Sequence, residues 1–231
     1  MRQQLLHGYV LHQRAYRENS KLTHFFSLEY GRIDGVARQK LPPLYQPTLV
    51  YASGKTSLKS FAKAESAGKP HQLSGQTLFA GFYLNELLVR LLPLEEPCPD
   101  LFAAYADALH ELGLLDITST IQQAVLPILR RFEAVLLTTL GYPVRFDQDV
   151  YQHPIMAEQQ YQFELGAGFV AADRGEQGAV LLLMQTEQAF SAATLPMLTR
   201  VFRRVLAEQL GEQPLRSRDL WRAGQNPSFS S

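Results

Sequence analysis

The chain has 231 residues, with 22 Lys and Arg, 22 Asp and Glu, 46% hydrophobic residues and a single cysteine, Cys98. The composition is that of a globular protein, and one cysteine excludes an intramolecular disulfide and a cysteine-rich zinc site. The N-terminus leads into no long apolar run, and no stretch approaches the roughly 18 apolar residues of a membrane span. We therefore expect a cytoplasmic protein without a signal peptide.

The charge is distributed unevenly along the chain. Residues 1–70 contain 11 Lys/Arg and 4 Asp/Glu, a balance of +7, whereas residues 71–231 contain 11 and 18, a balance of −7. A basic segment attracts a polyanion whatever the charge of the whole chain. The asymmetry therefore favours a nucleic-acid partner for the N-terminal segment. The alternative is a chance asymmetry on a solvated surface.

The first 65 or so residues show the period-two alternation of β-strands. Residues 6–12 and 22–29 alternate clearly, and Gly31 predicts a hairpin turn. Further strands are expected at residues 32–37, 48–52 and 56–62. In the last of these, Leu58 and Phe61 are expected to face inward and Lys59 outward. Five short strands joined by tight turns predict a small barrel or a curled sheet.

Beyond a linker at residues 67–70 the periodicity becomes helical. Apolar residues recur at helical spacing in three segments, residues 79–91, 101–112 and 128–140. Pro127 is expected either in the first turn of the third helix or as a kink in a longer one.

Residues 144–185 lose the helical spacing and are expected to hold a small β-hairpin turning at residues 166–168. A last helix follows, capped by Thr194 or Ser191 and ended by Gly211. The chain is thus predicted to be an α+β multidomain protein. Its predicted parts are a nucleic-acid-binding barrel at residues 1–68 and a helical domain at residues 74–231.

No pattern in the sequence indicates catalysis or a bound cofactor. The six histidines lack the spacing of metal ligands. The run Gly166-Ala167-Gly168-Phe169-Val170-Ala171 matches a loose dinucleotide pattern, but the preceding strand alternates and no helix follows, so a hairpin turn is the better interpretation. A phosphate loop and a nucleophile elbow are both missing from the sequence. We expect neither an enzyme nor a cofactor.

The cations of the N-terminal segment fall in the strands or in the turns between them, and aromatic residues are interleaved with them. Cations follow phosphates and aromatic rings stack on bases, as single-stranded nucleic acid requires. About half of the rings are expected in the barrel core, because alternate strand residues face inward. The candidate nucleic-acid contacts are Arg14, Arg17, Lys21, Arg32, Arg38, Lys40, Lys55, Lys59 and Lys63.

The helical half carries two further basic clusters, Arg130 with Arg131, and Arg200 with Arg203 and Arg204. Arg200 and Arg204 lie one helical turn apart and share a face. Because the rest of this half is acidic, the clusters indicate anion sites. For any single arginine the alternative is a solvated helix face.

Segments across both halves resemble the RecO family of recombination mediators. They include residues 8–11, 26–32, 44–47, 64–65, 83–88 and 101–102, with Tyr105. The most specific segments are Leu129-Arg130-Arg131-Phe132-Glu133, Leu140-Gly141-Tyr142 and Pro214-Leu215-Arg216-Ser217-Arg218-Asp219-Leu220.

The resemblance implies an OB-fold barrel followed by a helical domain, without enzymatic activity and associated with the nucleoid. It implies binding to single- and double-stranded DNA, annealing of strands coated by single-stranded-DNA-binding protein, and help in loading the recombinase. The implied protein partners are RecR and the acidic, Phe-ended C-terminal tail of the coating protein. For that tail, the resemblance assigns Arg130 and Arg131 beside an apolar helical groove.

The chain departs from the family pattern after the third predicted strand. Its basic loop, Arg38-Gln39-Lys40, is shorter and less charged than is usual, and the four-cysteine zinc module of some relatives cannot form with one cysteine. Two alternatives therefore remain: an OB-fold RNA-binding protein, and a protein–protein adaptor that has lost DNA binding. A nucleotide-dependent enzyme ranks last.

Overall fold

The computed structural model describes residues 3–115, 121–217 and 219, so Arg218 and Leu220 of the C-terminal motif lie outside the described residues. The chain divides into two compact units. The first comprises Met1–Val125 and Pro214–Ser231, and the second Leu126–Gln213. The described residues after Gln213 thus belong to the N-terminal unit.

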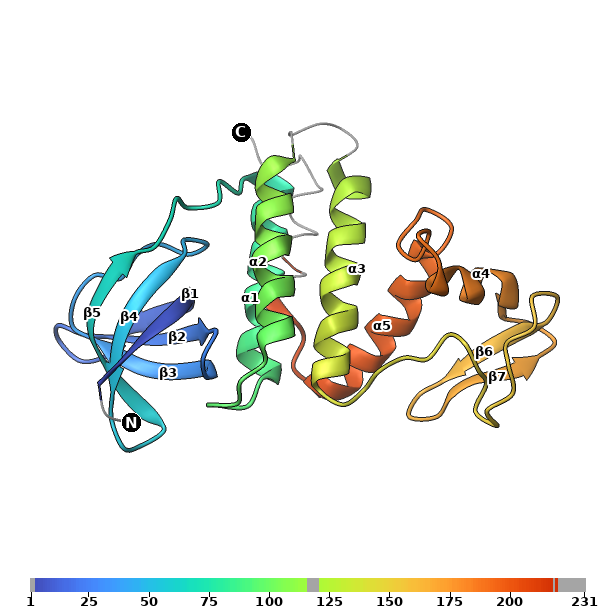
Figure 1. Cartoon of the computed structure of the whole chain (residues 1–231), viewed down its shortest axis with the longest axis horizontal. Coiled ribbons are helices and arrows are strands. Elements are labelled where there is room, and N and C mark those ends of the chain that lie inside the picture. Colours follow the sequence, from blue (N-terminus) through green and yellow to red (C-terminus); the bar gives the residue numbers. More distant parts are fainter. Residues whose placement is uncertain (1–2, 116–120, 218, 220–231) are drawn as a thin grey trace. The chain divides into compact units, whose positions relative to one another are not determined.

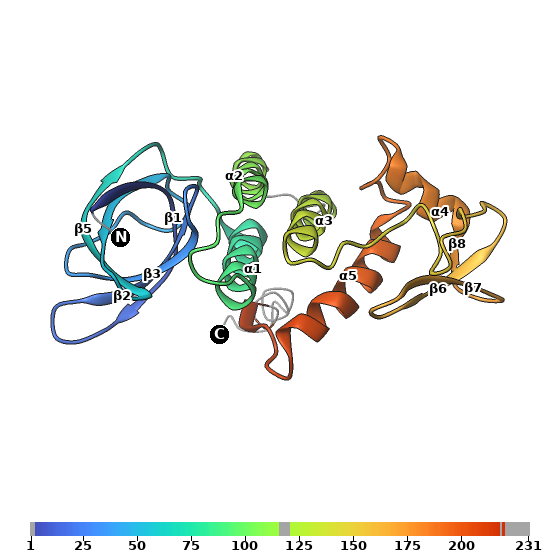
Figure 2. The same cartoon turned by 60° about the horizontal axis from the view of Figure 1, so that its bottom comes forward.

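Five strands close into a barrel in the first unit (Figures 1 and 2). They are β1 (Gln4–Ala15), β2 (Lys21–Ser27), β3 (Gly31–Ala37), β4 (Thr48–Ser53) and β5 (Leu58–Ser66). Their order is β1-β2-β3-β5-β4, with β3 and β5 parallel and the other pairs antiparallel. This is the architecture of an OB-fold. The predicted barrel is confirmed, and each predicted strand overlaps an observed one.

Inward-facing side chains fill the barrel, as strand alternation requires. The core consists of Leu6, Val10, Phe25, Ile33, Ala37, Leu41, Val50, Ala52 and Phe61. Gly35 lies so close to this core that a Cβ atom there would meet the Phe61 ring at 2.6 Å. A larger residue at position 35 would therefore displace the ring.

Strand β5 differs from the prediction in the direction of two side chains. Lys59 is buried, with 4% of its surface exposed, and its Nζ lies 2.7 Å from the Glu95 carboxylate and 2.6 Å from the Thr56 carbonyl oxygen. Leu58 is 37% exposed. The predicted directions of both were wrong because the strand alternates regularly about Phe61, which places Lys59 on the inward side.

Two helices, α1 (Gly75–Leu91) and α2 (Pro99–Leu114), pack against the barrel. The aromatic contacts between barrel and α2 join Tyr9 and Phe26 to Phe102 and Tyr105, with ring centroids 5.3–5.8 Å apart. Asn85 of α1 donates to the Leu11 carbonyl at 2.8 Å and accepts from the Tyr105 hydroxyl at 2.6 Å. The barrel and these helices therefore share an apolar interface in which Asn85 Oδ1 and Nδ2 each form a hydrogen bond.

The second unit holds most of α3 (Ile121–Thr139) and a three-stranded sheet of order β7-β6-β8. The remaining elements are β6 (Gln160–Glu164), β7 (Gly168–Ala172), β8 (Glu176–Gln177), α4 (Gly178–Leu182), the 3-10 turn Leu183–Gln185 and α5 (Leu195–Leu210). Pro127 lies inside α3. Of the two predicted positions for this proline, the one within a longer helix is therefore correct.

The glycine run at 166–168 joins β6 to β7 as a hairpin turn, and Gly166 and Gly168 have φ values of 78° and 128°. Such values favour glycine. The hairpin turn therefore explains the two glycines, and a dinucleotide-binding motif is not needed to account for them. The predicted fold class, an N-terminal OB-fold barrel followed by a mainly helical region with a small hairpin, is confirmed. None of the helices in the described ranges is long and apolar enough to cross a membrane.

Candidate nucleic-acid interface

Cross-strand pairing arranges the outward side chains of four barrel strands in two rows. One row joins His12, His24, Asp34 and Leu58, and the next joins Arg14, Leu22, Val36 and Ser60. We call these eight residues the barrel face. The rings of His12 and His24 stack with centroids 5.8 Å apart, which confirms that they share one side of the sheet.

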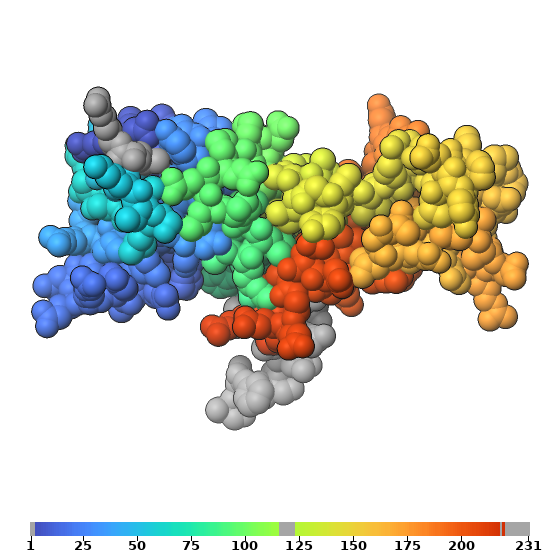
Figure 3. Space-filling view, turned by 90° about the horizontal axis from the view of Figure 1, so that it is seen from below, coloured from blue at the N-terminus to red at the C-terminus, as the bar shows by residue number. Residues whose placement is uncertain are grey.

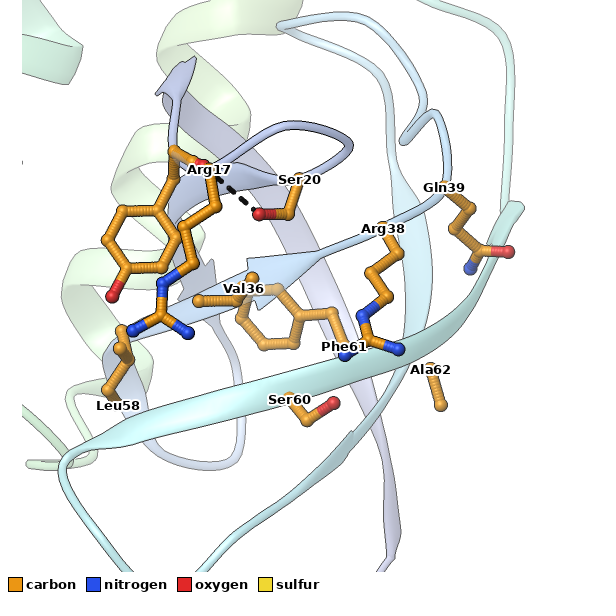
Figure 4. A pocket seen from close by; sticks show the side chains of 10 residues that line it. Arg17, Ser20, Val36, Arg38, Gln39, Leu58, Ser60, Phe61 and Ala62 are labelled. Carbon is orange, nitrogen blue, oxygen red and sulfur yellow. Dashed lines mark hydrogen bonds between the residues drawn. The ribbon is translucent and has the colours of Figure 1, made fainter.

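A hollow of about 710 Å³ adjoins the second row. Its lining comes from the β1–β2 turn (Tyr16, Arg17, Ser20), the end of β3 (Val36, Arg38, Gln39) and β5 (Leu58, Ser60, Phe61, Ala62). Figure 4 shows Arg17 and Arg38 on either side of the Phe61 ring. OB-folds bind oligonucleotides over strands 2 and 3 and the neighbouring loops. The hollow therefore adjoins the β1–β2 turn and strand β3, which are two parts of the surface over which OB-folds bind ligands.

Two of the nine predicted cations, Arg17 and Arg38, line this hollow. Arg17, in the β1–β2 turn, holds its guanidinium 5.3 Å from the centroid of the Tyr16 ring, and Glu18 in the same turn offsets one positive charge. Six of the nine predicted cations are exposed and form no ion pair with any residue that the structure describes. They are Arg14, Arg17, Lys21, Arg38, Lys40 and Lys55.

Arg32 instead joins the barrel to the end of α1. It pairs with the Asp34 carboxylate at 2.9 Å, and its Nη1 donates to the carbonyls of Val89 and, at 3.2 Å, Leu92. The last carbonyls of a helix lack hydrogen-bond donors within the helix, and a cation at this end also interacts favourably with the negative end of the helix dipole. We therefore assign Arg32 a structural role, as we do the buried Lys59.

Lys63 is exposed at the far end of β5 but is ion-paired with Glu65. Hydrogen bonding to that carboxylate, the larger cause, and its negative charge raise the pKa of Lys63. Lys63 therefore stays protonated, and the negative charge of Glu65 offsets its positive charge.

Burial and charged neighbours shift the pKa values of two residues in the first row, His12 and Asp34. Burial lowers the pKa of His12, and so do the charges of His24, Arg14 and Arg216. Burial would raise the pKa of Asp34, but hydrogen bonds from His24 at 2.7 Å and from Arg32 lower it overall. Asp34 is thus held ionised by groups that surround it.

The aromatic residues contribute less to this surface than the sequence indicated. Phe25 and Phe61 belong to the core, Phe26 packs on α2, and Tyr45 is buried, whereas Tyr16 lines the hollow. Sequence reasoning missed the apolar members of the face, which are Leu22, Val36 and Leu58. Strict alternation counted from Phe25, Ala37 and Phe61 would have found all three.

The arginines of α3 and α5 are more strongly engaged. Arg130 is 7% exposed and pairs with Glu133 at 2.5 Å, while Arg131 is half-buried. On α5, Arg200 donates to both carboxylate oxygens of Glu176, at 2.8 and 2.7 Å.

Arg204, one turn along α5, donates to the Phe163 carbonyl at 2.7 Å and lies over the Phe163 ring at 5.7 Å. Arg203 is exposed. These three arginines line a hollow of about 580 Å³ against β6. Two of the three predicted cations of α5 are therefore already bound within the unit.

The structure offers little for metal or thiol chemistry. In the part of the chain that the structure describes, no three His, Cys, Asp or Glu side chains are grouped to hold a metal ion. Burial and the charge of Glu96 raise the pKa of the Cys98 thiol to about 11. A neutral, buried thiol is a poor nucleophile and a poor metal ligand.

The barrel and the helices that follow it define the class of proteins that join an N-terminal OB-fold to a helical C-terminal region. Residues 1–67 match the family described as Recombination protein O N terminal, and residues 72–219 match Recombination protein O C terminal. The chain belongs to the RecO family of DNA repair proteins.

Individual relatives agree over nearly the full length. The chain is 40% identical over 223 residues to the DNA repair protein RecO of Pseudomonas paraeruginosa, with 92% of each chain covered. It is 38% identical over 225 residues to that of Pseudomonas putida, covering 93% of this chain and 96% of the relative. For Methylococcus capsulatus the identity is 36% over 230 residues, with 94% and 92% covered. The resemblance seen in the sequence is confirmed, as is the prediction of a DNA repair protein.

Proposed function

We propose that the chain is a recombination mediator that binds single- and double-stranded DNA on the barrel face. It anneals complementary strands coated by single-stranded-DNA-binding protein and helps to load the recombinase at the nucleoid. The observation that carries the proposal is the grouping of exposed Arg14, Arg17 and Arg38 around apolar side chains on an OB-fold of this family.

The barrel face and the hollow beside it offer two kinds of contact to a single strand. Guanidinium groups neutralise phosphates, and the half-exposed Leu22 and Val36, the imidazole of His12 and the Tyr16 ring give surfaces on which bases can lie. Annealing requires only that two strands are held close with their charge screened. It therefore needs no covalent chemistry.

Partner binding is proposed for the second unit. Arg131 and Val135 lie one turn apart on α3 and are both half-buried. A cation beside an apolar side chain suits the terminal carboxylate and the ring of a Phe-ended acidic tail. Arg130 is buried and paired with Glu133, so Arg131 is the arginine of this pair that is more open to the tail. RecR is proposed as a partner from the family alone.

Equilibrium binding to a labelled single-stranded DNA oligomer and a matched RNA, over a series of salt concentrations, tests the DNA proposal. We expect tight DNA binding with a steep salt dependence, weakened in Arg38→Ala and unchanged in Arg174→Ala. Arg174 is a matched control because it is exposed in a turn of the second unit. Equal binding to RNA would favour the RNA-binding alternative.

The partner proposal has its own experiment. Arg131→Ala should weaken binding of an acidic, Phe-ended peptide while DNA binding is retained. Equal loss of both ligands would contradict the division of labour between the two units. Retained peptide binding by a wild-type protein that binds neither nucleic acid would favour the adaptor.

A further inference from the structure

After α5 the chain returns to the first unit and follows α1, as Figure 3 shows where the red segment meets the green surface. The carboxylate of Glu86 accepts three hydrogen bonds there. They come from the Arg216 amide at 2.9 Å, the Ser217 amide at 2.9 Å and the Ser217 hydroxyl at 2.6 Å. Arg90 donates to the Pro214 carbonyl at 3.1 Å. Residues 214–217 are thus fixed to one helix.

Burial adds to these hydrogen bonds. Leu215 is 1% exposed and Ser217 is 4% exposed, whereas Arg216 between them is exposed. The buried side chains of Leu215 and Ser217 therefore anchor the segment, while the side chain of Arg216 stays in solvent. The Arg216 side chain therefore takes no part in the anchor, which uses only its backbone amide.

Two consecutive residues of α1 place Arg216 beside strand β1. Asn85 donates to the Leu11 carbonyl at 2.8 Å, and Glu86, the next residue, holds the Arg216 amide. Burial is the largest cause of the lowered pKa of His12, the residue after Leu11, and the charges of His24, Arg14 and Arg216 lower that pKa further. A cation of the C-terminal segment and a cation of the barrel face thus both contribute at this imidazole.

We infer that Arg216 is a phosphate-binding residue that extends the barrel face onto the C-terminal segment, and that Glu86 is its positioning residue. The inference rests on the proposed function, because it concerns the path of the same nucleic acid. A strand that crosses Arg14 and His12 towards α1 meets Arg216 next.

The ionisation state of Glu86 agrees with a positioning role. Burial raises the pKa of its carboxyl, but hydrogen bonds from Ser217 and Arg216 and the charge of Arg90 lower it overall. The ionised carboxylate therefore has its acceptors occupied by the anchor. Because the ligand would bind only the anchored arrangement well, DNA binding and anchoring should stabilise each other.

The test is the slope of log K against log salt concentration for a single-stranded DNA oligomer. Each lost phosphate contact lowers the slope by about 0.7 on a single strand. We expect Arg216→Ala to lose about that much, Arg216→Lys to keep the wild-type slope, and Arg174→Ala to be unchanged. The lysine variant excludes an effect on folding, because it retains the charge and the backbone anchor.

Glu86→Ala separates the positioning role from direct contact. It should lower the slope as Arg216→Ala does, and the double variant should lose no more than either single one. A wild-type slope in Arg216→Ala, with a reduced slope in Arg38→Ala, would overturn the inference and leave the proposed function intact. An additive loss in the double variant would overturn the role of Glu86. If the wild-type protein bound no DNA, the proposed function itself would fail.

Discussion

The barrel and α5 both carry groups of three arginines, but their surroundings differ. Arg17 and Arg38 lie at the rim of a hollow with no ion pair to a described residue, and Arg14 is exposed on the same side. On α5, Arg200 is held by Glu176 and Arg204 by the Phe163 carbonyl. The two groups contain the same number of arginines, but more of those on the barrel are available to bind a ligand.

The difference matters because an arginine that already forms a bidentate pair must lose that pair before it binds phosphate. A bidentate guanidinium–carboxylate pair is among the stronger exposed contacts, so exchange gains little. An exposed arginine beside apolar groups loses only water. DNA binding should therefore depend on the barrel cations far more than on those of α5.

The largest expected effect follows from removing the barrel cations together. Arg14→Ala, Arg17→Ala and Arg38→Ala combined should lower the salt slope by about 2 and weaken single-stranded DNA binding on the order of 50-fold at physiological salt. Fluorescence anisotropy measures both quantities.

The matched comparison is Arg200→Ala, Arg203→Ala and Arg204→Ala combined, which removes the same charge. Its affinity for DNA should change less than about 2-fold, because two of these cations are engaged within the unit. Similar losses of affinity in the two triple variants would show that ion pairing on α5 does not reduce its contribution to DNA binding.

A second prediction concerns the hydrogen bond from Tyr105 to Asn85, at the interface between the barrel and the helices. Tyr105→Phe removes the donor to Asn85 Oδ1 and should lower the free energy of unfolding by about 1–3 kcal/mol, since a buried acceptor loses its partner. Urea unfolding measures this. Tyr142→Phe, at a ring that is 47% exposed, is the control and should have no effect.

A third prediction uses the pH dependence of Asp34. Asp34→Asn should lower the free energy of unfolding at pH 7 by about 1–2 kcal/mol, because the hydrogen bonds from Arg32 and His24 lose their ionic partner. The pKa of Asp34 is lowered in the folded state, so its contribution is present above the unfolded value near pH 4 and is lost as pH falls through the folded value. The difference between wild type and variant should shrink in acid. A constant difference down to pH 2 would contradict it.

The smallest expected effect concerns His12. Its pKa is lowered by burial and by neighbouring cations in the free protein, and a bound phosphate would raise it. Binding should then take up a proton, so affinity should rise about 3-fold between pH 8 and pH 6 beyond the rise seen in His12→Gln. Isothermal titration in two buffers of different ionisation enthalpy measures the proton uptake. No difference between wild type and variant would place the phosphate path elsewhere.

The strands and long helices followed from local periodicity, which the sequence displays directly. The roles of Arg32 and Lys59 did not, because their partners, the α1 carbonyls and Glu95, lie tens of residues away. The short helix α4 was not predicted, since five residues are too few to show a period. The anchoring of Arg216 by Glu86 spans 130 positions and has no local signal.

Hydrogen–deuterium exchange of the full chain, with and without a single-stranded DNA oligomer, tests whether the barrel is the part of the chain that binds DNA. We predict slower exchange in the β1–β2 turn around residues 16–20 and at the end of β3, with α5 and β6 unchanged. Protection confined to α5 and β6, with the barrel unaffected, would contradict this prediction.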